Sequence, residues 1–159
     1  DGKDIKHNIK KWQSLISYVP QDIYLLDDTI KKNIAIGEEE EQIDYHRLNI
    51  AINSAQLKSY IDELPEKLET FVGNRGVRIS GGQKQRIGIA RALYLERDIL
   101  ILDEATNSLD IDNEKKIVET IINQYQSKTI ICIAHNSKVL EKFDNILSLD
   151  NGSTSLAKN

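Results

Sequence analysis

Apolar residues occur in two patterns along the chain, and the order of the two patterns predicts an α/β fold. Residues 15–19 (LISYV) form a short apolar run that stops at Pro20, because proline supplies no donor to a strand ladder. Residues 98–104 (DILILDE) are apolar at every central position, which is typical of a parallel strand buried on both faces. Residues 129–134 (TIICIA) and 145–150 (NILSLD) predict two more strands.

Apolar residues spaced three and four apart predict helices between these strands. The helices lie at about 44–71, with a break at Pro65, and at about 82–96, 111–125 and 137–142. Strands that alternate with helices predict a parallel sheet flanked by helices. The sheet part covers about 1–36 and 98–152, and about 37–97 is an inserted helical subdomain. We expect the polar tail, residues 153–159, to fray.

Composition limits the classes of partner. The chain has 159 residues, 40% of them apolar, which fits one domain or most of one. Its net charge of −4 provides no general positive field, so we expect no nucleic-acid partner. The single cysteine, Cys132, lies in an apolar run and is expected to be a buried hydrophobe rather than a reactive thiol. No apolar run approaches the roughly 20 residues that cross a bilayer. The absence of methionine suggests a piece of a longer protein.

The stretch ISGGQ, residues 79–83, precedes the second helix and has two interpretations. Ser80 and Gln83 fit a capping box, which requires no ligand. A capping box does not explain Gly81 and Gly82, because glycine in a helix costs about 0.5 to 1 kcal/mol relative to alanine. Bare amides at the positive end of a helix let an anion approach closely, so a phosphate contact is the second interpretation.

Asp103 and Glu104 end a predicted buried strand, where parallel sheets gather ligands. One carboxylate there can hold Mg²⁺, and the other can orient or deprotonate a water that attacks a γ-phosphate. A strand that simply ends in a polar turn is the alternative.

Three other polar residues also have two interpretations. Asp110 is explained by helix N-capping as well as by chemistry. His135 by itself is more often structural than catalytic, and Gln21 by itself would be a turn residue.

The order of these stretches closely resembles the nucleotide-binding domain of ATP-binding cassette (ABC) transporters, from about Ile5 to Gly152. The matching motifs are VPQ at 19–21 (Q-loop), ISGGQ at 79–83 (signature), ILILDE at 99–104 (Walker B), SLD at 108–110 (D-loop) and IAH at 133–135 (switch histidine). Ile79 stands where the signature usually has leucine. The resemblance implies a P-loop NTPase-like sheet with an inserted signature subdomain.

Two further stretches resemble the exporter branch of the family. They are VPQDIYLLDDTIKKNI at 19–34 and TFVGNRG at 70–76, which resembles the X-loop near the membrane domain. Asn74 replaces a usual glutamate there, and Arg97 replaces a common proline, a change we expect to be structural only. The phosphate-binding pattern G-x-x-x-x-G-K-[ST] does not occur in the chain. The aromatic residue that stacks on adenine in the family, expected further upstream, is absent as well. We therefore expect the N-terminal part of the domain to be missing.

The resemblance implies that two such domains pair head to tail around ATP and Mg²⁺. The resemblance also implies a role for each matching residue. The residues that face the nucleotide of the partner are Ser80, Gly81, Gly82, Gln83 and Asp110. Asp103 and Gln21 hold the metal, Gln21 also senses the attacking water, Glu104 polarises that water, and His135 holds the γ-phosphate.

The implied function is the ATPase of an exporter, with the transmembrane domain fused upstream and the ATPase on the cytoplasmic face of the plasma or inner membrane. One alternative is a soluble ABC protein that acts on chromosomes or ribosomes. Another is a non-catalytic regulatory half, against which the presence of both Glu104 and His135 argues.

Overall fold

A computed structural model describes residues 4–73, 78–107, 109–150 and 152–158. Asn74 and the rest of the predicted X-loop at 74–76 lie outside these ranges, as does Ser108 of the SLD stretch.

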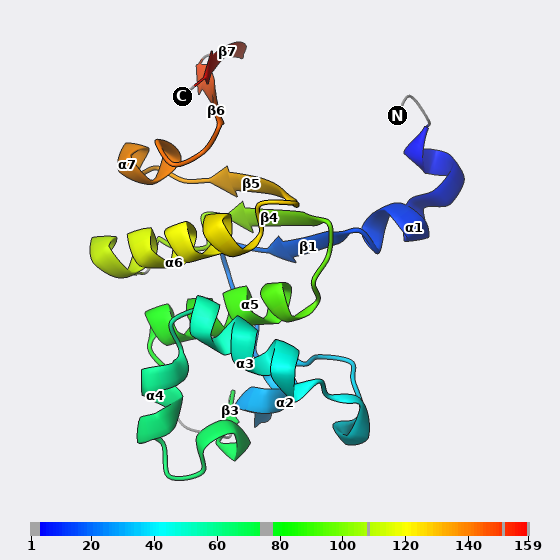
Figure 1. Cartoon of the computed structure of the whole chain (residues 1–159), viewed down its shortest axis with the longest axis vertical. Helices are drawn as coiled ribbons and strands as arrows, with labels where there is room; N and C mark the ends of the chain where they lie inside the picture. Colours follow the sequence, from blue (N-terminus) through cyan, green and yellow to red (C-terminus); the bar gives the residue numbers. More distant parts are fainter. Residues whose placement is uncertain (1–3, 74–77, 108, 151, 159) are drawn as a thin grey trace.

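A three-stranded parallel sheet lies at the centre of the chain (Figure 1). Its strands are β1 (Ile16–Val19), β4 (Ile99–Asp103) and β5 (Thr129–Ile133), in the order β1-β4-β5. β4 pairs in parallel with both neighbours, with Val19 opposite Leu102 on one side and Ile133 opposite Asp103 on the other. The predicted parallel sheet is confirmed for these three strands.

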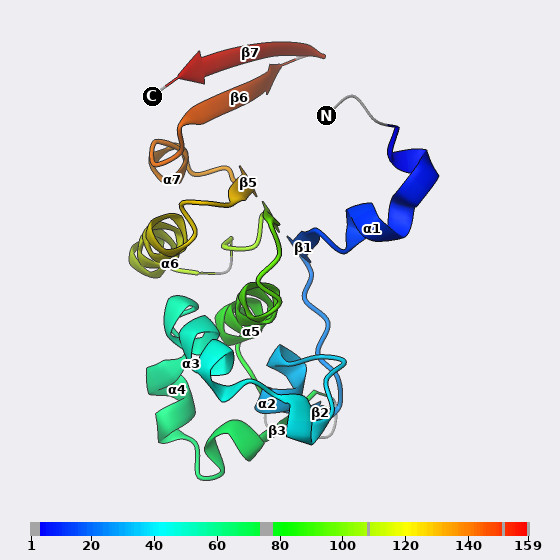
Figure 2. The ribbon, with the colours of Figure 1, turned by 45° about the vertical axis from the view of Figure 1, so that its right-hand side comes forward.

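Two long helices, α5 (Gly81–Tyr94) and α6 (Ile111–Gln124), cover the same face of this sheet (Figure 2). Leu100 and Leu102 point to that face and are at most 4% exposed. On the other face Ile131 is 47% exposed, and Ile101 is only partly buried. The predicted burial of the central strand on both faces is therefore wrong for the described residues, because both helices lie on one side.

The predicted helical insertion is present, but it is more broken than the periodicity indicated. Within about 37–97 it contains η2 (Glu40–Gln42), α3 (Tyr45–Ser54), α4 (Lys58–Glu63), η3 (Lys67–Glu69), β3 (Phe71–Val72) and α5. Before residue 37, α2 (Ile30–Ile34) follows β2 (Asp28–Thr29), which pairs antiparallel with β3. The chain turns sharply between α3 and α4 at Gln56, whose φ is +54°. A non-glycine residue in this left-handed region gives no signal in the apolar pattern.

The two ends of the chain differ from expectation. The N-terminal end forms η1 (Ile5–Asn8) and α1 (Ile9–Gln13), which the pattern did not predict. After α7 (Ser137–Leu140), β6 (Asn145–Asp150) pairs antiparallel with β7 (Ser153–Lys158) instead of joining the parallel sheet. The expected fraying of the tail is also wrong, because β6 supplies the hydrogen-bond partners of its backbone.

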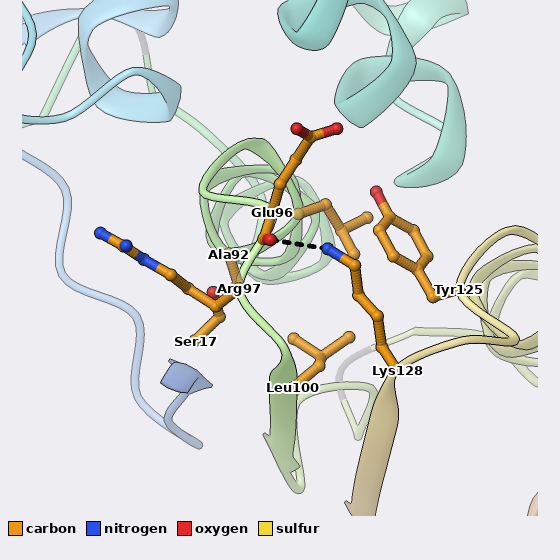
Figure 3. Close-up of a pocket in the computed structure, with 8 residues that line it drawn as sticks. Ser17, Ala92, Glu96, Arg97, Leu100, Tyr125 and Lys128 are labelled. Carbon is orange, nitrogen blue, oxygen red and sulfur yellow. Dashed lines mark hydrogen bonds between the residues drawn. The ribbon is translucent and has the colours of Figure 1, made fainter. Parts of the chain in front are cut away.

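A lysine that directly precedes β5 binds the connection from α5 to β4. Lys128 Nζ donates to the carbonyl of Glu96 at 2.6 Å, at a residue whose φ is +51° (Figure 3). The cavity beside it, next to Ser17, is about 10 Å³, the space of a single water, so it is no ligand site. Arg97 is exposed, and its side chain points away from Lys128.

The segment after β1 is bound tightly to α5. Asn33 is fully buried, and its Nδ2 donates to the carbonyl of Thr29 at 3.0 Å. Arg91 on α5 donates from Nε to the carbonyl of Asn33 at 2.7 Å. Gly88 of α5 faces Ile23 so closely that an added Cβ would lie 2.4 Å from Ile23 Cδ1. Polar bonds and close packing therefore join the two segments.

Replacing Gly88 by alanine should lower the thermal unfolding midpoint. Overpacking costs about 1 to 3 kcal/mol, which exceeds the roughly 0.5 to 1 kcal/mol that alanine gains over glycine in a helix. Ile23→Val removes the Cδ1 atom and should recover part of the loss in the double variant. Losses that simply add in the double variant would contradict this packing.

Candidate functional site

The carboxyl edge of the parallel sheet brings the ends of β4 and β5 together. The amide of Glu104 donates to the carbonyl of Ile133 at 3.0 Å, which continues the pairing one residue beyond β4. His135 follows two residues after Ile133. The sheet therefore places Glu104 and His135, predicted separately from two strand ends, side by side.

Glu104 is held at three points. Its Oε1 lies 2.9 Å from His135 Nε2, and its Oε2 accepts from Asn107 Nδ2 at 2.8 Å. Its backbone φ of +48° is left-handed, which costs a non-glycine residue about 1 to 3 kcal/mol. The pairing across the edge and the bonds on both carboxylate oxygens hold it there. Asn107 was missed by sequence reasoning, although its place three residues after Glu104 in a turn was a usable signal.

Asp103 lies on the opposite face from the helices and is bound across the sheet. Its Oδ2 accepts from the hydroxyl of Tyr18 at 2.7 Å, and this hydrogen bond raises the pKa of the Tyr18 hydroxyl. Tyr18, on β1, is the second residue that sequence reasoning missed. No sequence signal identifies it, because the contact spans 85 residues and depends on strand order.

The donor set at this edge fits Mg²⁺ that arrives with phosphates. Mg²⁺ prefers oxygen ligands and is usually bound through one or two carboxylates plus substrate phosphates. Asp103 offers such an oxygen. The described ranges contain no group of three or more His, Cys, Asp or Glu residues able to hold a metal, so a cage made by protein alone is not present in them.

Gln21 lies in the exposed loop that follows β1, at the same edge of the sheet. In the part of the chain that the structure describes, it makes no hydrogen bond to Asp103, Glu104 or His135. The structure therefore places Gln21 near this edge without bringing it into their network.

The predicted capping box at the start of α5 is present. Ser80 Oγ accepts from the amide of Gln83 at 3.2 Å, and Gln83 Oε1 accepts from the amide of Ser80 at 2.9 Å. The Gln83 side chain is therefore engaged in the cap through its Oε1 atom. Gly81 and Gly82 contribute the first two amides of the helix, which have no intrahelical acceptor.

These glycines share an open pocket with Asp110. The residues that line it are Tyr60, Ser80, Gly81, Gly82, Gln83, Arg86, Leu109 and Asp110. Asp110 is the N-cap of α6, and the side-chain and backbone hydrogen bonds from Asn113 lower the pKa of its carboxyl. Capping thus explains Asp110, yet the fold also places its carboxylate beside the start of α5. Asp103, Glu104 and His135 do not line this pocket.

The model of the family described as ABC transporter matches residues 1–107. The chain belongs to the ABC transporter family. This confirms the family that the motifs indicated. A solved structure of a bacterial Atm1-family ABC exporter with ATP bound is 38% identical and superposes with a TM-score of 0.87, covering 96% of this chain. The expected parallel sheet with its helical signature subdomain is thereby confirmed for this ABC chain.

This ABC chain is similar to curated proteins that include bacterial, animal and fungal ones. The ATP-dependent lipid A-core flippase of Cupriavidus pinatubonensis is 39% identical over 145 residues, which is 91% of this chain. The ATP-binding cassette sub-family B member 5 of Mus musculus is 38% identical over 154 residues. The chain spans 25% and 12% of these two relatives and 27% of the exporter chain. Among the residues that the structure describes, no helix has the length and apolar character of a membrane span.

Cys132 on β5 is partly buried, and burial raises the pKa of its thiol from 9.0 to about 11. At pH 8 its thiolate fraction should therefore be about a hundredfold below that of an ordinary cysteine. We expect slow alkylation by iodoacetamide at pH 8, followed by mass spectrometry, and faster alkylation towards pH 11. Urea-unfolded protein is the control. Equal rates for folded and unfolded protein at pH 8 would contradict the shift.

Proposed function

We propose that this chain is the ATP-hydrolysing part of an ABC exporter. The observation that carries the proposal is the contact between Glu104 Oε1 and His135 Nε2 at the carboxyl edge of the sheet, beside Asp103. A fixed carboxylate next to an imidazole suits the activation of a water and the stabilisation of charge on a transferring phosphoryl group. The names of the relatives, a flippase and an exporter, agree with this function.

Each residue of the site then has a defined chemical role. Glu104 orients and polarises the attacking water through its carboxylate, and His135 donates from its ring to the γ-phosphate. Asp103 and Gln21 would hold Mg²⁺ through their oxygens. When bound, Mg²⁺ neutralises charge on the phosphates. Asn107 and Tyr18 fix the carboxylates of Glu104 and Asp103 through the hydrogen bonds described above.

The separation of two half-sites supports a head-to-tail pair of such chains. The amides of Gly81 and Gly82 face one open pocket, and Glu104 and His135 lie outside its lining. We infer that a nucleotide bound at the Glu104 edge of one copy meets the start of α5 in a second copy. In this arrangement Ser80 keeps the helix capped, while the two glycines leave room for the terminal phosphate.

The attachment to the membrane is a property of the whole transporter rather than of this chain by itself. We propose that a transmembrane domain precedes this chain in the same polypeptide and holds it at the cytoplasmic face of the plasma or inner membrane. The open face of the sheet, where Tyr18, Ile131 and Ile133 are 47 to 53% exposed, supports further polypeptide covering this surface.

Glu104→Gln in the full-length transporter should lower the turnover of ATP by about 10²- to 10⁴-fold, the contribution typical of a positioned acid or base. The nucleotide-bound dimer should persist, because the amide keeps the shape of the side chain. Steady-state ATPase rates and size-exclusion chromatography with ATP measure the two effects. Glu63→Gln, on the exposed end of α4, is the control. Normal turnover by Glu104→Gln would refute the role of Glu104.

The 159-residue chain alone should bind ATP weakly or not at all. It has no G-x-x-x-x-G-K-[ST] stretch, which supplies most phosphate contacts in P-loop proteins. Isothermal titration calorimetry with ATP and Mg²⁺ tests this expectation. A micromolar dissociation constant for this chain would overturn it.

A further inference from the structure

Glu114 is a buried carboxylate that the function above does not use. It lies in the first turn of α6 and is only 6% exposed. Glutamate is rarely buried to this extent unless it is paired, because removing a charge from water is costly. Its partners therefore indicate what it does.

Each of its two oxygens accepts one hydrogen bond from a different loop. Thr106 Oγ1 donates to Oε1 at 2.7 Å, and Asn136 Nδ2 donates to Oε2 at 2.9 Å. Thr106 is 2% exposed. Hydrogen bonds to a carboxylate are about twice as strong as those between neutral groups. Glu114 thus joins two loops that the sequence separates by about 30 residues.

These two loops are the ones that carry the proposed catalytic groups. Thr106 follows Glu104 by two residues, and Asn136 follows His135 directly. The Asn136 side chain is fixed at both ends, since its Oδ1 also accepts from the amide of Lys138 at 3.2 Å. The His135 side chain is 78% exposed, so packing around the ring does little to fix it. The hydrogen bond from the neighbouring Asn136 to Glu114 can hold this loop in place instead.

We propose that Glu114 is a positioning residue, which holds the loop of Glu104 against the loop of His135. The inference rests on the proposed function of those two residues. Removing the carboxylate leaves the buried Thr106 hydroxyl and the Asn136 amide without this acceptor. Among the described residues, the backbone bond from Glu104 to Ile133 and the contact between Glu104 and His135 then remain to link the two loops. The distance between Glu104 and His135 becomes variable, which slows the chemical step more than it weakens nucleotide binding.

The test uses the full-length transporter and measures kcat and KM for ATP hydrolysis. Glu114→Ala should lower kcat about ten- to hundredfold, by analogy with outer-shell residues that orient metal ligands, with KM changed less than about twofold. Glu114→Gln keeps one carbonyl acceptor and should lose less. Glu119→Gln is the matched control, because Glu119 lies on the same helix and pairs outward with Lys142 at 3.1 Å. It should behave as wild type.

A second arm separates positioning from general destabilisation. In a His135→Ala background, Glu114→Ala should reduce kcat by less than about twofold further, because the group that it positions is gone. An equal loss in both backgrounds, or an unchanged kcat in Glu114→Ala, would overturn the proposal. If Glu114→Ala does not fold, Asn136→Ala decides: it removes one donor from a partly buried side chain and should lower kcat in the same way.

Failure of the proposed function gives a different result. A wild-type protein without ATPase activity, or a fully active Glu104→Gln variant, would refute the function itself. Wild-type activity that Glu104→Gln abolishes and that Glu114→Ala and Asn136→Ala leave intact would refute only the role of Glu114.

Discussion

The parallel pairing of β4 with β5 is the constraint on which the site depends. Because both strands run the same way, their ends meet at one edge, and Asp103, opposite Ile133, is followed directly by Glu104. The backbone bond from Glu104 to Ile133 keeps the two strand ends adjacent, and the Glu104 carboxylate contacts His135 there. The left-handed backbone of Glu104 is tolerated because this pairing over-determines it.

Around this edge, the chain fixes its functional side chains through contacts between distant segments. Tyr18 holds Asp103 across the open face of the sheet, and Glu114 joins the two loops on the covered side. In the helical part, Arg91 on α5 donates to the carbonyl of Asn33 and so binds the segment after Gln21 to this helix. Together with the close packing of Gly88 against Ile23, this bond holds the segment against α5.

The start of α5 illustrates how one stretch serves two needs. Ser80 and Gln83 satisfy each other in a capping box, so the helix begins there without any ligand. The two glycines add nothing to the cap and weaken the helix, yet they leave its first amides bare in an open pocket beside Asp110. The cap and the bare amides are thus separate features of adjacent residues.

The sequence by itself determined the order and type of the main elements, the capping box, and the positions of Asp103, Glu104 and His135 at strand ends. These features are local, since they follow from apolar spacing and from hydrogen bonds a few residues apart. Only the tertiary structure decided the partners of these residues: Tyr18 for Asp103, and Glu114 between Thr106 and Asn136. It also decided that β6 leaves the parallel sheet to pair with β7. Such contacts join residues far apart in the chain, 85 positions in the case of Tyr18 and Asp103, so apolar spacing over a few residues does not specify them.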